Sequence, residues 1–329
     1  MPNHQKQIPG MYGDIKLFAG TSCPKLAAEI ANYLGVSISG RDVIEFTNEN
    51  LLVRLHSSIR GQDVYVIQTT SRPVHRNLME LLIMLQTLRL DSAGRITAVV
   101  PYLCYARSDK KDQPRVPITA RLVADMIEIA GADRYMTLDL HSGQIQGFFS
   151  IPGDVLTTFH ILTEHTQKML PAMTNPVVVS TDLGFAKKAR NFAAKLDAPI
   201  AFVEKRRTGN KDHTEALSLI GDVTGRDVII VDDEVDTGGS VAEAVGLVKE
   251  QGARDVYLIF VHPIFSPGVE HKLLSIDLKK IVTTNTVPID PHVCDQLGDR
   301  LKVVSVAPLL GEVIRRAHEG RSVGEMFNE

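Results

Sequence analysis

The sequence contains no tryptophan, and aromatic residues make up only 5 % of its 329 positions, so its cores must be aliphatic. Its three cysteines, Cys23, Cys104 and Cys294, lack metal-type spacing, and their odd number favours a reducing compartment over a disulfide framework. No apolar run approaches the length of a membrane helix, and the first ten residues lack the apolar segment of a secretory signal. The net charge of −3 offers no broad basic surface. These absences predict a cytoplasmic protein that binds neither nucleic acid nor membrane.

Short β-branched strands alternate with helical patterns from end to end, which is typical of parallel α/β units. The first unit has a strand over residues 15–18 and then a helix with Pro24 in its first turn. We expect Thr21 or Ser22 to cap this helix and Gly35 to end it. Hydrophobic residues make up 44 % of the chain, and its length suits two domains with cores of their own. The sequence therefore predicts an α/β fold with parallel sheets.

The second half of the chain repeats the plan of the first. The segment GQDV begins at Gly61 and GRDV begins at Gly225, which is 164 residues later. Two similar strands end at Pro101 and Pro263, 162 residues apart. The nearly equal shifts predict an internal duplication, although two unrelated α/β domains would also look alike. The copies differ after one strand, where the second has DDEVDTGGS and the first has QTTSRPVHRN.

The segment VDDEVDTGGS, residues 231–240, carries the strongest functional signal. A buried strand over residues 227–231 leads into it and a helix follows, and ligands of open parallel sheets bind at strand carboxyl ends. The first N–H groups of the helix suit a phosphate, and the adjacent carboxylates suit the hydroxyls of a sugar, with or without a bridging cation. A capping aspartate and a turn are the alternative interpretation. The candidate residues are Asp232, Asp233, Asp236, Thr237, Gly238, Gly239 and Ser240.

Four other polar segments each have an ordinary explanation when taken alone. The charged loop 107–115 could be a solvated loop, and His141 at a strand end could be a packed residue. Asp182 begins a loop after another strand and could be a helix cap. Lys205 and Arg207 end a further strand and could be surface charge.

Together these segments resemble one family. DDEVDTGG resembles the ribose-5-phosphate loop of type I phosphoribosyltransferases and of ribose-phosphate pyrophosphokinases. YARSDKKDQPRVPITARLVADMI, DLHSGQIQGFF, STDLG and EKRR also match the second family, which the duplicated domain and the length favour. The resemblance runs from about residue 15 to 327. It implies two tandem type I phosphoribosyltransferase-like domains: residues 13–160 on the ATP side with a degenerate phosphate loop, and 161–329 with the ribose 5-phosphate loop. Whether the last helix packs back on the N-terminal domain stays open.

The resemblance implies a ribose-phosphate diphosphokinase that transfers the pyrophosphoryl group of ATP to the anomeric hydroxyl of ribose 5-phosphate. It places Lys205 and Arg207 at catalysis, with Arg207 also at the sugar phosphate. It places Mg²⁺ near Asp182 and near His141, with contact to His141 either direct or through water. It also implies a homohexamer. The ATP-binding residues that it implies are Phe46, Asn48, Glu49, Asn50, Arg107, Ser108 and Asp112.

Two positions depart from the family pattern. Asn50 stands where the family usually has glutamate, and Ser108 where it usually has glutamine, so nucleotide recognition is affected. Two other functions remain open: a non-catalytic regulatory member of the family and a phosphoribosyltransferase. The retained Lys205 and Arg207 argue against the first, and the duplicated ATP-side domain argues against the second.

Overall fold

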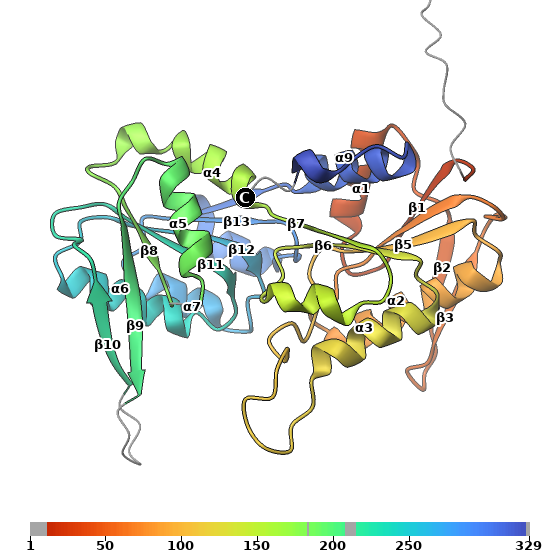
Figure 1. Cartoon of the computed structure of the whole chain (residues 1–329), viewed down its shortest axis with the longest axis horizontal. Coiled ribbons are helices and arrows are strands. Elements are labelled where there is room, and N and C mark those ends of the chain that lie inside the picture. The colour runs from red at the N-terminus through yellow and green to blue at the C-terminus, as the bar shows by residue number, and fades with distance from the viewer. Residues whose placement is uncertain (1–11, 183, 208–214, 327–329) are drawn as a thin grey trace, which may run out of the picture. The chain divides into compact units, whose positions relative to one another are not determined.

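The computed structural model describes residues 12–182, 184–207 and 215–326, without the side chains of residues 205–207, 215, 216 and 325. Within these ranges the chain forms two compact units. The first consists of the chain up to Thr157 together with the chain from Val306 on, and the second is Thr158–Ser305. Each unit is a mainly parallel sheet with helices on both faces (Figure 1). This arrangement confirms the predicted α/β fold class.

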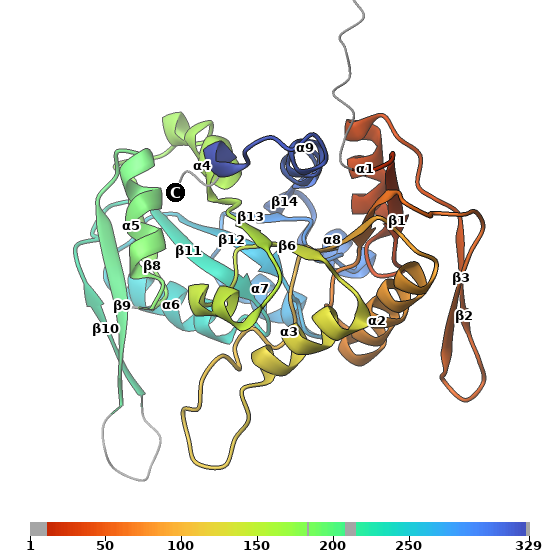
Figure 2. The same ribbon diagram turned by 45° about the vertical axis from the view of Figure 1, so that its right-hand side comes forward.

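The first unit contains a five-stranded parallel sheet. Its strands are β1 (Ile15–Ala19), β4 (Asp63–Ile67), β5 (Arg95–Val100), β6 (Arg134–Leu138) and β7 (Gly153–Leu156), in the order β1-β4-β5-β6-β7. Its helices are α1 (Pro24–Leu34), α2 (Val74–Leu90), α3 (Thr119–Ala130), α9 (Ala307–His318) and the 3-10 turns η1 (Gly143–Phe148) and η4 (Gly324–Met326). Helices α2 and α3 pack on one face of the sheet through an aliphatic core, and α1 and α9 lie side by side on the other (Figures 1 and 2).

The ends of α1 show one prediction confirmed and one wrong. Gly35 ends the helix with φ +69°, a left-handed conformation that glycine adopts without strain. Cys23, rather than Thr21 or Ser22, holds the N-cap position, and it makes no side-chain cap hydrogen bond. The two hydroxyls donate instead to polar side chains that approach from α2 and from the end of β4. These distant partners cannot be seen in a local capping pattern.

The aspartates of the two GxDV segments are buried and hydrogen-bonded. Asp63 accepts hydrogen bonds from Arg95 Nε and Nη2 at 2.8 and 2.7 Å, and His318 Nδ1 lies 2.8 Å from its carboxylate. Since His318 is the last residue of α9, this cluster fixes the C-terminal helix within the first unit. Asp227 in the second copy accepts a hydrogen bond from the backbone N–H of Thr174 at 2.7 Å. The landmark thus marks a buried carboxylate at the start of the second core strand in each copy.

The second unit contains a seven-stranded sheet in the order β10-β9-β8-β11-β12-β13-β14. These strands are β8 (Val177–Ser180), β9 (Ile200–Arg207), β10 (Glu215–Ile220), β11 (Val228–Val235), β12 (Val256–Pro263), β13 (Lys280–Thr284) and β14 (Leu301–Val304). The helices are α4 (Phe159–Gln167), α5 (Ala186–Lys195), α6 (Gly239–Glu250), α7 (Val269–Leu274), α8 (Pro291–Leu297) and the 3-10 turns η2 (Leu170–Ala172) and η3 (Gly298–Arg300). Helices α4 and α5 pack on one face, and α6, α7 and α8 on the other. Among the helices of the described ranges, none is both long and apolar enough to cross a bilayer.

The two sheets repeat one strand order. The parallel series β1-β4-β5-β6-β7 corresponds to β8-β11-β12-β13-β14, and each copy inserts an antiparallel hairpin after its first strand. In the second unit this hairpin, β9 and β10, extends the sheet. In the first unit it forms a separate two-stranded sheet of β2 (Arg41–Glu45) and β3 (Leu51–Leu55), which packs on the unit through β3 and projects its turn end in Figure 2. The shared order supports the internal duplication predicted from the sequence.

Candidate functional site

The acidic pair of the second unit lies on the end of β11. This strand runs four residues beyond the predicted end at Val231, because Asp232 pairs with Phe260 and Val235 with Pro263 of β12. The loop before α6 is therefore short. Gly238 occupies the N-cap position of α6 with φ +76°, where a side chain would be strained. The strand and helix thus place the acidic pair beside a helix N-terminus, as predicted.

Asp232 is held by two hydrogen bonds and lies beside a like charge. Thr181 Oγ1 donates to its Oδ2 at 2.8 Å, and the backbone N–H of Asp233 donates to its Oδ1 at 2.8 Å. Burial, together with the charge of Asp233, raises the pKa of Asp232 well above the ordinary carboxyl value. Sugar hydroxyls or a cation at this position would stabilise the ionised form.

The loop between β11 and α6 is tied to the loop that follows β12. Ser266 Oγ donates to Asp236 Oδ1, and the Ser266 N–H donates to the Asp236 carbonyl at 3.2 Å. Thr237 and Ser240 are exposed at the start of α6, where the first N–H groups of the helix also lie. The described part of the loop therefore presents the hydroxyl and N–H donors that a phosphate requires. Sequence reasoning missed Ser266, because no motif marks it.

Asp182 lies after β8, the strand next to β11. It is exposed, and its Oδ1 accepts a hydrogen bond from the backbone N–H of Phe185 at 2.8 Å. This bond closes the turn before α5, whose N-cap residue is Phe185 and which has no side-chain cap hydrogen bond, so Asp182 is not the helix cap that the sequence offered as the ordinary explanation. The second carboxylate oxygen of Asp182 can still face a ligand, so this turn bond and ligand contact are compatible.

Lys205 and Arg207 belong to β9, which pairs with β8 on the side opposite β11. Their backbones pair with Leu217 and Glu215 of β10. Their side chains lie outside the described residues, so the catalytic assignment of this pair stays a prediction.

In the first unit, Arg107 and Ser108 follow β5, and Asp112 lies farther along the same loop. Arg107 and Asp112 are exposed. The backbone of Ser108 bonds to the Tyr105 carbonyl at 2.8 Å and accepts from the Ala120 N–H at 3.2 Å. These bonds close a turn at Tyr105 and tie Ser108 to the start of α3.

His141 is exposed and lies three residues beyond the end of β6. The turn that follows it reaches the Arg107–Asp112 loop, because Gln144 Nε2 donates to Asp109 Oδ2 at 2.7 Å. Asp109 is buried, with 7 % of its surface exposed. Loops from two adjacent strand ends, one with the predicted metal-side histidine and one with predicted ATP contacts, are thus joined. Neither Gln144 nor Asp109 was singled out from the sequence.

The remaining predicted ATP residues, Phe46, Asn48, Glu49 and Asn50, form the turn of the β2–β3 hairpin. All four are exposed, and Phe46 leaves half of its surface open. The Phe46 N–H donates to the Asn50 carbonyl at 2.9 Å, which closes the turn on itself. This segment therefore presents its side chains to solvent from the end of the hairpin.

The first unit lacks an open counterpart of the acidic site in the part of the chain that the structure describes. The last register pair of β1 and β4 is Ala19–Ile67, and that of β8 and β11 is Ser180–Val231. Gly20 and Gln68 therefore stand where the second unit has Thr181 and Asp232. A Cβ on Gly20 would lie 1.9 Å from Gln68 Oε1, so the glutamine fills the space that a larger residue would occupy.

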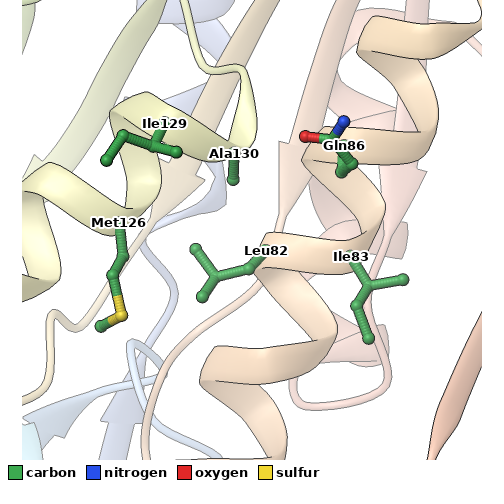
Figure 3. Close-up of a pocket in the computed structure, with 6 residues that line it drawn as sticks. All are labelled: Leu82, Ile83, Gln86, Met126, Ile129 and Ala130. Carbon is green, nitrogen blue, oxygen red and sulfur yellow. The ribbon is translucent and has the colours of Figure 1, made fainter.

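A shallow hollow of about 310 Å³ lies between α2 and α3 (Figure 3). Leu82, Ile83 and Gln86 line it from α2, and Met126, Ile129 and Ala130 line it from α3. Its lining is apolar apart from one amide, and it contains none of the predicted site residues. It offers no group that would hold a phosphate or a sugar.

A dense metal cage is absent from the described ranges, where no three histidine, cysteine or acidic side chains are placed to hold a metal ion. Mg²⁺ usually keeps several waters and binds one or two protein ligands together with substrate phosphates. The exposed His141 and Asp182, each at a strand end, fit that type of binding.

Two family models match the chain. One describes the N-terminal domain of ribose phosphate pyrophosphokinase and matches residues 15–131. The other describes the phosphoribosyl synthetase-associated domain and matches residues 208–328.

Full-length relatives agree with these matches. The ribose-phosphate pyrophosphokinase of Wolinella succinogenes is 43% identical over 313 residues, covering 95% of this chain and 98% of the relative. That of Clostridium acetobutylicum is 44% identical over 329 residues and covers 100% of both chains. Among solved structures, phosphoribosylpyrophosphate synthetase from Mycobacterium smegmatis is 39% identical with a TM-score of 0.88, covering 93% of this chain and 99% of that one.

Proposed function

The chain belongs to the ribose-phosphate pyrophosphokinase family. On this basis we propose which residues bind each substrate and which stabilise the transferred group. The enzyme transfers the pyrophosphoryl group of ATP to the anomeric hydroxyl of ribose 5-phosphate, giving 5-phosphoribosyl 1-pyrophosphate and AMP. The observation that carries this function is the identity of 43% and 44% across the full length of relatives with that name.

The second unit binds ribose 5-phosphate. Asp232 and Asp233 accept hydrogen bonds from the vicinal hydroxyls of the sugar. Burial and the charge of Asp233 raise the pKa of Asp232, so hydrogen-bond donors or a positive charge would stabilise its ionised form. The segment from Asp236 to Ser240 holds the 5-phosphate with backbone N–H groups and hydroxyls at the start of α6. The tether from Ser266 supports this role, because it orders the loop before the sugar arrives.

The first unit supplies the nucleotide contacts. Arg107, Ser108 and Asp112 contact ATP from the loop after β5, and the hairpin turn 46–50 contacts the adenine. Lys205 and Arg207 stabilise the charge that develops on the transferred phosphoryl oxygens. A protein nucleophile is not required, and burial raises the pKa of Cys23 and Cys104 to about 11, which leaves both thiols unreactive at neutral pH.

Mg²⁺ is the cofactor in this proposal. When bound, it would neutralise charge on the phosphates of ATP. His141 in the first unit and Asp182 in the second are each a candidate Mg²⁺ contact, direct or through water, and the exposure of each at a strand end supports that role. The rest of the site orients the sugar, places the triphosphate and excludes water.

A homo-oligomer in the cytoplasm completes the proposal, with a hexamer implied by the family resemblance. Apolar side chains exposed on α2 and α3 support burial against another copy: Leu90 is 75%, Leu122 is 55% and Ile129 is 77% exposed. The three cysteines, which form no disulfide within the described residues, support a reducing compartment. Light scattering that gives the mass of one chain at working concentration would contradict the assembly.

The decisive experiment measures AMP release by the purified protein with Mg²⁺, ATP and ribose 5-phosphate, with each component omitted in turn. We expect AMP only in the complete mixture. A phosphoribosyltransferase would release no AMP from these substrates, and a non-catalytic member of the family would be inactive under all conditions.

The double variant Asp232→Asn/Asp233→Asn should lose sugar binding and keep ATP binding. Calorimetry showing the reverse would exchange the two substrate assignments.

A further inference from the structure

Arg76, near the start of α2, is a charged residue to which the proposed mechanism gives no role. Its Nε donates to Glu45 Oε2 at 2.8 Å. Its Nη1 donates to Thr21 Oγ1 at 2.9 Å and to Glu80 Oε2 at 2.9 Å. One guanidinium therefore joins the helix, the segment after β1 and the β2–β3 hairpin.

Glu80 fixes the orientation of this guanidinium. Its side chain is fully buried, and it also accepts hydrogen bonds from the Thr21 N–H at 2.7 Å and the Thr21 hydroxyl at 2.5 Å. A buried carboxylate with a cation and two further donors is well satisfied, and losing one partner would be costly. The contacts of Nη1 with Thr21 and Glu80 thus hold the Arg76 guanidinium in place, and its Nε is oriented toward Glu45.

Glu45 is the last residue of β2. It pairs with Leu51 in the hairpin register, and Phe46 follows it directly in the chain. The contact with Arg76 therefore acts on the hairpin at the final pair before the turn 46–50. At the other end of the hairpin, Arg41 Nε donates to the Ala19 carbonyl at 2.6 Å. The hairpin also packs on the unit through Val53 of β3, which is buried in the core beside α2, so the contact with Arg76 adds an anchor at the end of the hairpin that carries the turn.

We propose that Arg76 is a positioning residue that fixes the hairpin turn and thereby sets the affinity for the nucleotide. It acts through Glu45 and touches no substrate itself. This role depends on the proposed function in one respect, which is the assignment of the turn 46–50 to the adenine.

A second ion pair on the same hairpin supplies a matched control. Arg54 Nη2 lies 2.6 Å from Asp42 Oδ2, and the side chains of this pair are 65% and 33% exposed. The side chains of Arg76 and Glu45 are 32% and 44% exposed. The control pair joins β2 to β3, whereas Arg76 joins the hairpin to α2. Arg54→Gln therefore removes an ion pair within the hairpin, where Asp42 keeps His56 Nε2 at 2.8 Å, without releasing the turn from the unit.

The first measurement needs no nucleotide. Hydrogen exchange of the Phe46 and Glu49 N–H groups, which bond to carbonyls within the turn, reports its order in the free protein. We expect Arg76→Gln and Glu45→Gln each to speed this exchange several-fold, while Arg54→Gln leaves it within about twofold of the parent rate. Equal exchange in all four proteins would overturn the proposal. Glu45→Gln keeps the test decisive if Arg76→Gln fails to fold, because Glu45 is on the surface.

The second measurement compares kinetics in the complete AMP assay. Arg76→Gln and Glu45→Gln should each raise the KM for ATP about fivefold, the upper range for a partly exposed ion pair. We expect kcat and the KM for ribose 5-phosphate to stay within about twofold, and the double variant to be no worse than either single variant. Additive effects, or an equal rise with Arg54→Gln, would overturn the proposal. An inactive parent protein would refute the proposed function itself, whereas an active parent with unchanged variants would refute only the role of Arg76.

Discussion

Thr181 donates its hydroxyl to Asp232 at 2.8 Å, and this bond joins the ends of β8 and β11 through a residue of the proposed sugar site. This hydrogen bond lowers the pKa of Asp232, whereas burial and the charge of Asp233 raise it. The ionised form of Asp232 is therefore disfavoured in the free protein, and ribose hydroxyls that donate to it would favour ionisation.

This balance predicts the effect of pH on stability. The folded pKa of Asp232 is raised, so its favourable contribution is present below the ordinary carboxyl pKa of about 4 and is lost as pH rises through the folded pKa. Asp232→Asn should remove that loss of stability. Thermal unfolding from pH 4 to 8 should therefore show a smaller decline for the variant than for the parent. Thr181→Val should steepen the decline, and identical curves for all three proteins would contradict this account.

The tether between Ser266 and Asp236 predicts a pre-organised phosphate loop. Ser266→Ala removes the hydroxyl donor and leaves the backbone bond in place, so the fold should persist. We expect ribose 5-phosphate binding to weaken by about tenfold, the equivalent of one hydrogen bond to a charged group. Calorimetry would measure this change, with ATP binding as the internal control. Unchanged sugar affinity would show that the loop is ordered by other contacts.

The family resemblance assigns a transition-state role to Lys205, whose backbone lies on β9 next to β8. Lys205→Ala should lower kcat by about a hundredfold or more, the scale of one pre-organised donor, and change sugar affinity far less. Lys195, exposed on α5, supplies the control, because Lys195→Ala should leave kcat unchanged. A Lys205 variant that kept half of the parent turnover would remove this residue from the mechanism.

The presence of Asn50 and Ser108 predicts weak binding of the nucleotide. An amide accepts hydrogen bonds less strongly than a carboxylate, and serine reaches less far than glutamine. We expect a high KM for ATP or weak discrimination among purine triphosphates. Asn50→Glu with Ser108→Gln should lower the KM for ATP several-fold. A parent enzyme that is tight and strictly specific for ATP would show that other contacts replace these two.

The fold was predictable because its signals are local. Strand and helix periodicity indicated the α/β class, and the repeated GxDV segments indicated a duplication that the matching strand orders support. The end of β11 was predicted four residues early, since Asp232 to Val235 read as polar loop residues while their pairing with β12 is invisible in the local sequence. The prediction of the N-cap residue of α1 was wrong for the same reason, because the partners of Thr21 and Ser22 lie 59 and 46 residues away in the sequence.

The candidate site was predictable only as far as its motifs extend. Glycine, hydroxyl and acidic residues at a strand end marked the loop from Asp232 to Ser240. The side chains that hold these residues come from elsewhere: Thr181 is 51 residues from Asp232, and Ser266 is 30 residues from Asp236. Such partners are set by tertiary packing, and no spacing rule reveals them.

The glutamine that fills the strand end of the first unit has a consequence for stoichiometry. In a duplicated chain, two equivalent sugar-phosphate sites would be the simplest outcome, yet Gln68 accepts bonds from the Ser22 N–H and hydroxyl at 3.0 and 2.6 Å. Its amide also donates to the Asn77 carbonyl at 3.1 Å, so its oxygen and its nitrogen are both engaged within the chain. Each chain should therefore bind one molecule of ribose 5-phosphate, and its titration should be hyperbolic for an isolated chain. The duplication gave the protein two sheets with one strand order, and a single sugar site would leave the other half free to specialise.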